Sequence, residues 1–178
     1  MSVGAFALGE FSQVLRLRIG AQVADLSGEV LFRVLFFGGI LMLPLCSSVV
    51  PGAVIPGGAV PFLIGAVVGW LGLLLRWWCF ITLGRYFTTV LKTSPNQAIV
   101  DRGPYRVLRH PSYTGLLLAL VGGGLMLGNW AGALASFALV IAAVLYRIRI
   151  EEHALITTVG DAYRLFSKTR ARLVPFVW

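Results

Sequence analysis

Long apolar runs alternate with short polar connectors along most of this chain. The runs cover Val34 to about Val54, Val60 to Leu75 with an extension past Arg76 to Leu83, Tyr113 to Leu127, and Ala131 to Tyr146. About 20 helical residues cross a hydrocarbon core of about 30 Å. The pattern therefore predicts an all-α integral membrane protein with about four spans.

The last two runs are separated only by Asn129 and Trp130. So short a link predicts that they form a helical hairpin. Each arm is short for a full crossing, so we expect the hairpin to tilt or to thin the bilayer locally.

The segments outside the spans have helical periodicity of their own. Residues 1–29 are predicted as an N-terminal interfacial helix, with Phe11 on its apolar side and Arg16 on its polar side. A fifth crossing there is a weaker alternative. Residues 151–168 are predicted as one further helix at the membrane surface, because apolar residues recur there at spacings of three and four. Residues 1–178 then form a single membrane domain, in which 30–84 hold the first two spans and 85–178 the candidate catalytic core.

Composition supports the membrane class. Of 178 residues, 58% are apolar and only 12% are charged, whereas soluble domains are about 25% charged. The two cysteines, Cys46 and Cys79, have no paired spacing, and His110 and His153 are the only histidines. We therefore expect no metal site.

The basic residues predict how the chain is oriented. All 15 Lys and Arg lie in the N-terminal part up to Arg33, between Arg76 and Arg109, or between Arg147 and Arg172. By the positive-inside rule, both termini and the middle loop are cytoplasmic, in the inner or plasma membrane. The net charge of +8 flanks apolar spans, which favours anionic lipid headgroups over nucleic acid as its counterpart.

Small residues on the spans predict close helix packing. Gly65, Gly69 and Gly72 share one face of the second span, where small side chains let another helix approach. The run Gly122 to Gly124 in the third span has the same interpretation. Its alternative is a slot for an apolar substrate.

Two polar clusters should meet at one end of the hairpin. Asp101 to Gly115 reads DRGPYRVLRHPSYTG, and Arg147 to Glu152 reads RIRIEE. Ionisable groups at a membrane boundary mark candidate functional sites. An ordinary charged helix end with an Arg147–Glu151 pair is the alternative, since these residues are four apart.

The residue types in these clusters suit binding more than hydrolysis. They include carboxylates, an imidazole, arginines and the rings of Tyr105 and Tyr113, without metal ligands or a nucleophilic Ser or Cys. Such a site suits a zwitterionic cofactor beside a lipid-like acceptor, and S-adenosylmethionine fits chemically.

The motifs resemble the isoprenylcysteine carboxyl methyltransferase family. They are RGPYxxxRHPxYxG, a tight apolar hairpin, RxxxEE, then Gly160-x-x-Tyr163 and Arg172-Leu173-x-Pro175, over about residues 85–178. The RHPxY core is shared with membrane phospholipid N-methyltransferases and, more loosely, with sterol reductases.

The resemblance implies roles for particular residues. Glu151 would hold the polar end of S-adenosylmethionine, with Glu152 beside it, and Arg147 would face the acceptor carboxylate. Arg147, Glu151 and His110 would be the catalytic residues. The cofactor-binding set would be Gln97, Ala98, Ile99, Val100, Tyr105, Arg109, His110, Pro111, Ser112, Tyr113, Glu151 and Glu152.

Carboxyl O-methylation of an isoprenylcysteine-like or other lipid-like acceptor is the activity that the resemblance implies. A carboxylate is ionised at neutral pH and needs no general base. An amine acceptor such as phosphatidylethanolamine must first lose a proton, to Glu151, Glu152 or His110. A nicotinamide-dependent membrane reductase, or a membrane scaffold without catalysis, are further alternatives. Many such reductases carry an acidic residue directly after the glycine of the Tyr-x-Gly segment. Here Leu116 follows Gly115, which disfavours the reductase.

Overall fold

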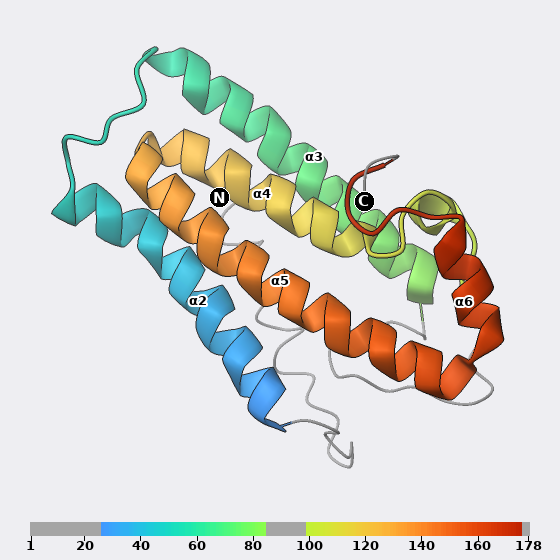
Figure 1. Cartoon of the computed structure of the whole chain (residues 1–178). Coiled ribbons are helices and arrows are strands. Elements are labelled where there is room, and N and C mark those ends of the chain that lie inside the picture. Colours follow the sequence, from blue (N-terminus) through green and yellow to red (C-terminus); the bar gives the residue numbers. More distant parts are fainter. Residues whose placement is uncertain (1–25, 85–98, 176–178) are drawn as a thin grey trace.

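In the computed structural model, which describes residues 26–84 and 99–175, four long helices lie side by side (Figure 1). They are α2 (Leu26–Val49), α3 (Ala59–Leu83), α4 (Pro111–Leu127) and α5 (Trp130–Val159). The short 3-10 helix η2 (Gly103–Arg106) precedes α4, and the short helix α6 (Asp161–Lys168) follows α5. Within these residues the only extended pairing consists of two isolated bridges, so the all-α prediction is confirmed.

Three of the helices are long and apolar enough to cross a membrane, namely Gly28–Val49, Ala59–Leu83 and Trp130–Val159. The fourth, α4, is apolar but shorter, with 17 residues. Large apolar side chains point outward from α2 and α3; Val34 is 63% exposed and Ile81 is 78% exposed. An exposed apolar surface of this kind is suited to lipid, and the chain is an integral membrane protein.

Several predicted boundaries are wrong. Helix α2 begins at Leu26, inside the predicted interfacial segment 1–29, because Glu29 and Arg33 pair one turn apart and continue the helix. It ends at Val49, before the turn at Pro51. Residues 1–25 lie outside the described residues, so the rest of that prediction stays untested.

The predicted surface helix 151–168 is two helices. Residues up to Val159 continue α5, which is 30 residues long and so is not a short arm. Gly160 then adopts φ 69°, a conformation that favours glycine, and only Asp161–Lys168 form a separate helix.

Helices α3 and α4 pack backbone to backbone through their glycines. A Cβ atom added to Gly65 would lie 2.6 Å from the carbonyl oxygen of Gly122, and one added to Gly115 would lie 2.6 Å from the carbonyl oxygen of Gly72. The packing prediction for Gly65, Gly72 and Gly122 is confirmed. Backbone of α3 fills the place at Gly122, and Ala133 of α5 fills the place at Gly124, so neither leaves a substrate slot. Gly123 has nothing within 4 Å, so the alternative stays a prediction there.

A tight turn fixes the α4–α5 hairpin. Gly128 ends α4 in the left-handed conformation, with φ 66°. The Asn129 side chain caps α5 by accepting a 2.8 Å hydrogen bond from the backbone N–H of Gly132. The same side chain donates to the Val50 carbonyl, at 2.9 Å. These bonds hold the hairpin, which brings the start of α4 close to the last turns of α5.

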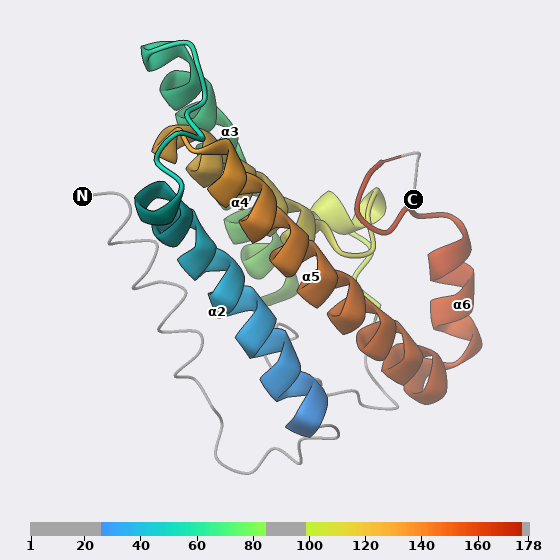
Figure 2. The ribbon, with the colours of Figure 1, turned by 60° about the vertical axis from the view of Figure 1, so that its left-hand side comes forward.

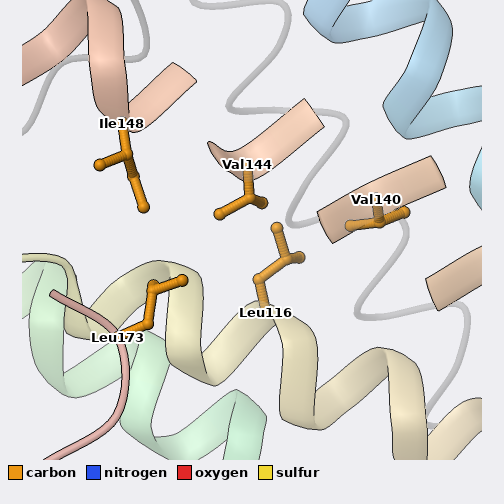
Figure 3. Close-up of a cluster of buried hydrophobic side chains, with 5 residues drawn as sticks. All are labelled: Leu116, Val140, Val144, Ile148 and Leu173. Atoms are coloured by element: carbon orange, nitrogen blue, oxygen red, sulfur yellow. The ribbon is translucent and has the colours of Figure 1, made fainter. Parts of the chain in front are cut away.

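A buried apolar cluster joins this hairpin to the C-terminal segment. Leu116 of α4 faces Val140, Val144 and Ile148 of α5, and Leu173 packs beside them (Figure 3). Val140 and Val144 are fully buried. The cluster therefore ties the segment after α6 to the polar end of the hairpin.

Candidate functional site

Backbone hydrogen bonds fasten the Arg109–His110 segment to the C-terminal segment. The N–H of Arg109 donates to the Ala171 carbonyl at 2.8 Å, and the N–H of His110 donates to the Arg172 carbonyl at 3.1 Å. A short parallel bridge pairs Leu108 with Ala171. Figure 1 shows the segment after α6 lying beside the loop that precedes α4. The segment therefore fixes the backbone on which His110 sits.

Glu152 is the centre of a buried ion cluster. Its Oε1 accepts from a guanidinium nitrogen of Arg109 at 2.6 Å and lies 3.3 Å from Nε2 of His110. Its Oε2 is bonded by Arg172, at 3.1 and 3.0 Å. The Glu152 side chain is only 9% exposed, and a buried carboxylate needs such partners. Both of its oxygens are engaged, so this cluster holds the loop before α4, α5 and the C-terminal segment together.

Glu151, its neighbour in sequence, faces a different partner. The hydroxyl of Tyr113 donates to Oε2 of Glu151 at 3.2 Å. The Tyr113 ring lies 5.9 Å from the His110 ring, centre to centre. Tyr113 thus links Glu151 to the start of α4, while His110 contacts Glu152. The predicted approach of the start of α4 to the Arg147–Glu152 segment is present in the structure.

Arg147 belongs to a second ion cluster, formed with α2. Its guanidinium, 9% exposed, pairs with Oε2 of Glu29. The other oxygen of Glu29 accepts from Nε of Arg33 at 2.9 Å. The Phe32 ring lies 5.5 Å from the Arg147 guanidinium carbon, within cation–π range. A carboxylate from the first span therefore sits on the arginine expected to face the acceptor.

A buried hydroxyl near the Glu152 cluster has no hydrogen-bond partner. Tyr163 of α6 is 4% exposed, and its Oη has no partner among the described residues. Burial, with the charge of Glu152 nearby, raises the pKa of this phenol above its usual range, so the group is a neutral donor. An unsatisfied buried polar group costs free energy. Tyr163 is therefore a neutral, buried donor for which the described residues supply no acceptor.

The other predicted residues lie around these clusters. Tyr105 and Pro111 are buried, and burial raises the pKa of the Tyr105 phenol above its usual range. The Ser112 carbonyl accepts from Arg76 of α3 at 3.3 Å. Ile99 and Val100 are half-buried in an irregular segment, and Gln97 and Ala98 lie outside the described residues.

Sequence reasoning missed three residues. Arg172 and Tyr163 stand in the motifs that carried the resemblance, yet neither received a role. Glu29 was assigned to an interfacial segment, although it is a lone acid just before an apolar run.

Helices of this kind, with an ion cluster at one end of the bundle, define an integral membrane protein with a polar site at its boundary. The model of the isoprenylcysteine carboxyl methyltransferase family matches residues 64–157. The chain belongs to that family.

Curated relatives have the same family name. Protein-S-isoprenylcysteine O-methyltransferase B of Arabidopsis thaliana is 38% identical over 109 residues, which are 60% of this chain and 55% of that protein. Form A from the same plant is 36% identical over 115 residues, 64% of this chain and 58% of that protein. The matched region thus spans little more than half the length of these relatives.

A solved structure shares the fold. It is described as the eukaryotic intramembrane Ras methyltransferase ICMT, without a monobody. It aligns with a TM-score of 0.66 at 23% identity, covering 97% of this chain and 64% of that one. The helical arrangement, including α2, is therefore that of a known membrane fold.

Proposed function

We propose that this chain is an S-adenosylmethionine-dependent membrane methyltransferase that methylates the carboxylate of an isoprenylcysteine-like or other lipid-like acceptor. The observation that carries the proposal is that α5 holds two ion clusters near its polar end. In one, Glu152 contacts His110, and in the other, Arg147 pairs with a carboxylate. Family membership favours methyl transfer over the reductase and scaffold alternatives.

The cofactor would be held by the polar residues where α4 begins and α5 leaves the apolar region. Glu151 and Tyr113 offer a carboxylate and a ring, and Tyr163 offers a hydroxyl donor that has no partner among residues 26–84 and 99–175. The contacts among Arg109, His110 and Glu152 hold the start of α4 against α5, and so fix the positions of these cofactor-binding residues. When bound, the cofactor supplies an electrophilic sulfonium methyl group. The wider cofactor-binding set is Gln97, Ala98, Ile99, Val100, Tyr105, Pro111 and Ser112, part of the same proposal.

Arg147 favours a carboxylate acceptor. Its guanidinium already binds a carboxylate, that of Glu29, and arginine–carboxylate pairing is directional as well as attractive. An ionised carboxylate needs no general base, so the protein has mainly to align the reactants and exclude water. Arg147 would orient the acceptor, which reaches it laterally from the bilayer.

Methylation of an amine, such as that of phosphatidylethanolamine, is the second candidate. It requires a proton acceptor. Both oxygens of Glu152 are engaged by cationic groups, which makes it a poor base. Glu151 and His110 would have to serve.

Orientation is part of the proposal. With the basic residues on the inside, the site would lie at the cytoplasmic face.

Titration calorimetry with S-adenosylhomocysteine tests the cofactor. We expect binding to the wild type and a loss of at least tenfold in His110→Ala and Glu151→Ala. The matched control is His153→Ala, because His153 is an exposed histidine on α5, the helix that carries Glu151. A folded wild type that does not bind would end both methyltransferase candidates.

Transfer of a radiolabelled methyl group tests the acceptor. We expect an S-farnesylcysteine derivative with a free carboxylate to be labelled, and phosphatidylethanolamine not to be. The opposite labelling would establish the amine alternative.

A further inference from the structure

Glu29 occupies the guanidinium that the proposed function assigns to the acceptor. The Glu29 carboxylate bridges two arginines, Arg147 through Oε2 and Arg33 through Oε1. These two arginines differ in surroundings: the side chain of Arg147 is 9% exposed and that of Arg33 is 32% exposed. Glu29 therefore has a buried partner on α5 and a more accessible one on its own helix.

We propose that Glu29 is a placeholder carboxylate, which pairs with Arg147 until the acceptor's carboxylate replaces it. The inference rests on the proposed function, since it concerns how that acceptor gains access to Arg147. It assigns a specificity role to the N-terminal part of the fold, which lies outside the family-matched residues 64–157.

The placeholder answers an electrostatic requirement. Arg147 is buried, and removing one partner of a buried ion pair is strongly destabilising. Glu151 also acts on Arg147 electrostatically, but Glu29 makes a direct ion pair with it, so the departure of Glu29 favours its replacement by another carboxylate. Figure 2 shows α2 running alongside α5, which is how Glu29 reaches Arg147. The incoming acceptor then exchanges one carboxylate for another, and the charge of Arg147 stays compensated.

Arg33 makes this exchange reversible. When Glu29 leaves Arg147, it keeps its bond to Arg33, 2.9 Å long and one turn away on α2. The displaced carboxylate therefore remains paired and close to the site.

The exchange also discriminates between acceptors and removes product. The reacting amine of an acceptor such as phosphatidylethanolamine carries no negative charge, so pairing with Arg147 cannot hold the reacting group itself in the way that it holds a carboxylate. Methyl transfer would form the O–CH3 bond of a neutral ester and break the S–CH3 bond of the sulfonium donor, which would leave as the neutral thioether S-adenosylhomocysteine, with no proton released or taken up. The ester no longer compensates Arg147, so Glu29 returns and displaces it.

Two substitutions with opposite predicted signs test the proposal. Glu29→Gln removes the competing charge and should tighten binding of the S-farnesylcysteine carboxylate roughly tenfold. Arg33→Gln leaves the Glu29–Arg147 pair intact but removes the alternative partner, and should weaken that binding several-fold. Affinity is measured directly in lipid nanodiscs, with S-farnesylcysteine methyl ester as the neutral comparison ligand. Arg149→Gln, an exposed arginine on α5, is the matched control and should change nothing.

The signs of the two changes in ligand affinity distinguish a placeholder carboxylate from a purely structural one. If Glu29 only braces the fold, both substitutions should weaken binding of the carboxylate ligand, which would overturn the proposal. An unchanged affinity in Glu29→Gln would overturn it as well. Binding of S-adenosylhomocysteine should stay the same in both variants. Failure of the proposed function is distinct, because the wild type would then bind neither S-adenosylhomocysteine nor the carboxylate ligand.

Discussion

The two ion clusters on α5 lie about one turn apart and are built differently. Glu152 is bonded by Arg109, His110 and Arg172, all from the C-terminal half of the chain. Arg147 is paired with Glu29, which lies 118 residues earlier, and Glu29 has a second arginine in reach. Both carboxylate oxygens are engaged in each cluster, but Glu29 is bonded to an arginine of its own helix as well as to Arg147, so it keeps a nearby partner when it leaves Arg147. One arrangement fastens the backbone, and the other is suited to exchange.

The largest effect is expected from removing the carboxylate of the first cluster. Glu152→Gln leaves Arg109 and Arg172 facing each other without their counter-ion. Breaking a buried pair of this kind costs about 3 kcal/mol or more, so the unfolding temperature in detergent should fall by roughly 10 °C. Binding of S-adenosylhomocysteine should be lost with it. Glu151→Gln is the control, and an equal thermal loss there would remove the distinction between the two carboxylates.

Arg147→Gln is expected to lower stability less than Glu152→Gln does, but to weaken binding of the acceptor specifically. Glu29 keeps Arg33 as its partner, so the protein should stay folded. The KM for the S-farnesylcysteine carboxylate should rise by roughly a hundredfold, about 2.7 kcal/mol, with S-adenosylhomocysteine affinity within threefold of wild type. Isotope-transfer kinetics and calorimetry measure the two quantities. A loss confined to the cofactor would show that Arg147 has been given the wrong ligand.

An intermediate effect should follow Tyr113→Phe, which removes the hydroxyl that donates to Glu151 at 3.2 Å. One hydrogen bond to a charged group is worth about 1.5–3 kcal/mol. We expect a tenfold or greater drop in S-adenosylhomocysteine affinity, while the ring still packs beside His110. Unchanged calorimetric affinity would place Glu151 outside the cofactor site.

The smallest effect on stability is expected at Tyr163. Its hydroxyl has no partner among the described residues, so Tyr163→Phe breaks no protein hydrogen bond and should change the free energy of unfolding by less than about 0.5 kcal/mol. Affinity for S-adenosylhomocysteine should nevertheless fall several-fold. Thermal unfolding and calorimetry on the same sample separate the two effects. A loss of stability with unchanged affinity would identify a structural hydroxyl instead.

The hydrophobic pattern was sufficient for the helices but not for their ends. Apolar runs located the cores of α2 to α5, and the link at Asn129 and Trp130 predicted the hairpin. The pattern missed the break at Gly160 because apolar residues continue at helical spacing on both sides of it, while a single glycine conformation decides the boundary.

The site was predictable only where sequence order implies proximity. A hairpin must bring the start of α4 close to Glu151 and Glu152, and the structure shows His110 beside Glu152 and Tyr113 bonded to Glu151. The hairpin does not imply that a carboxylate from α2 reaches Arg147, because no local pattern in the sequence encodes a contact across 118 residues. Nor did spacing distinguish the engaged Glu152 from its neighbour, since both stand on the same turn of α5.

The bonds from Arg109 and His110 to the carbonyls of Ala171 and Arg172 have a consequence for biosynthesis. During translation, α2 to α4 can enter the bilayer while residues 170–173 are still unmade or inside the ribosome. Until those residues emerge, the amides beside His110 lack their acceptors and Glu152 lacks Arg172. The contacts around His110 and Glu152 therefore form only after the segment that follows α6 has been made, so this end of the bundle folds later than the helices that precede it.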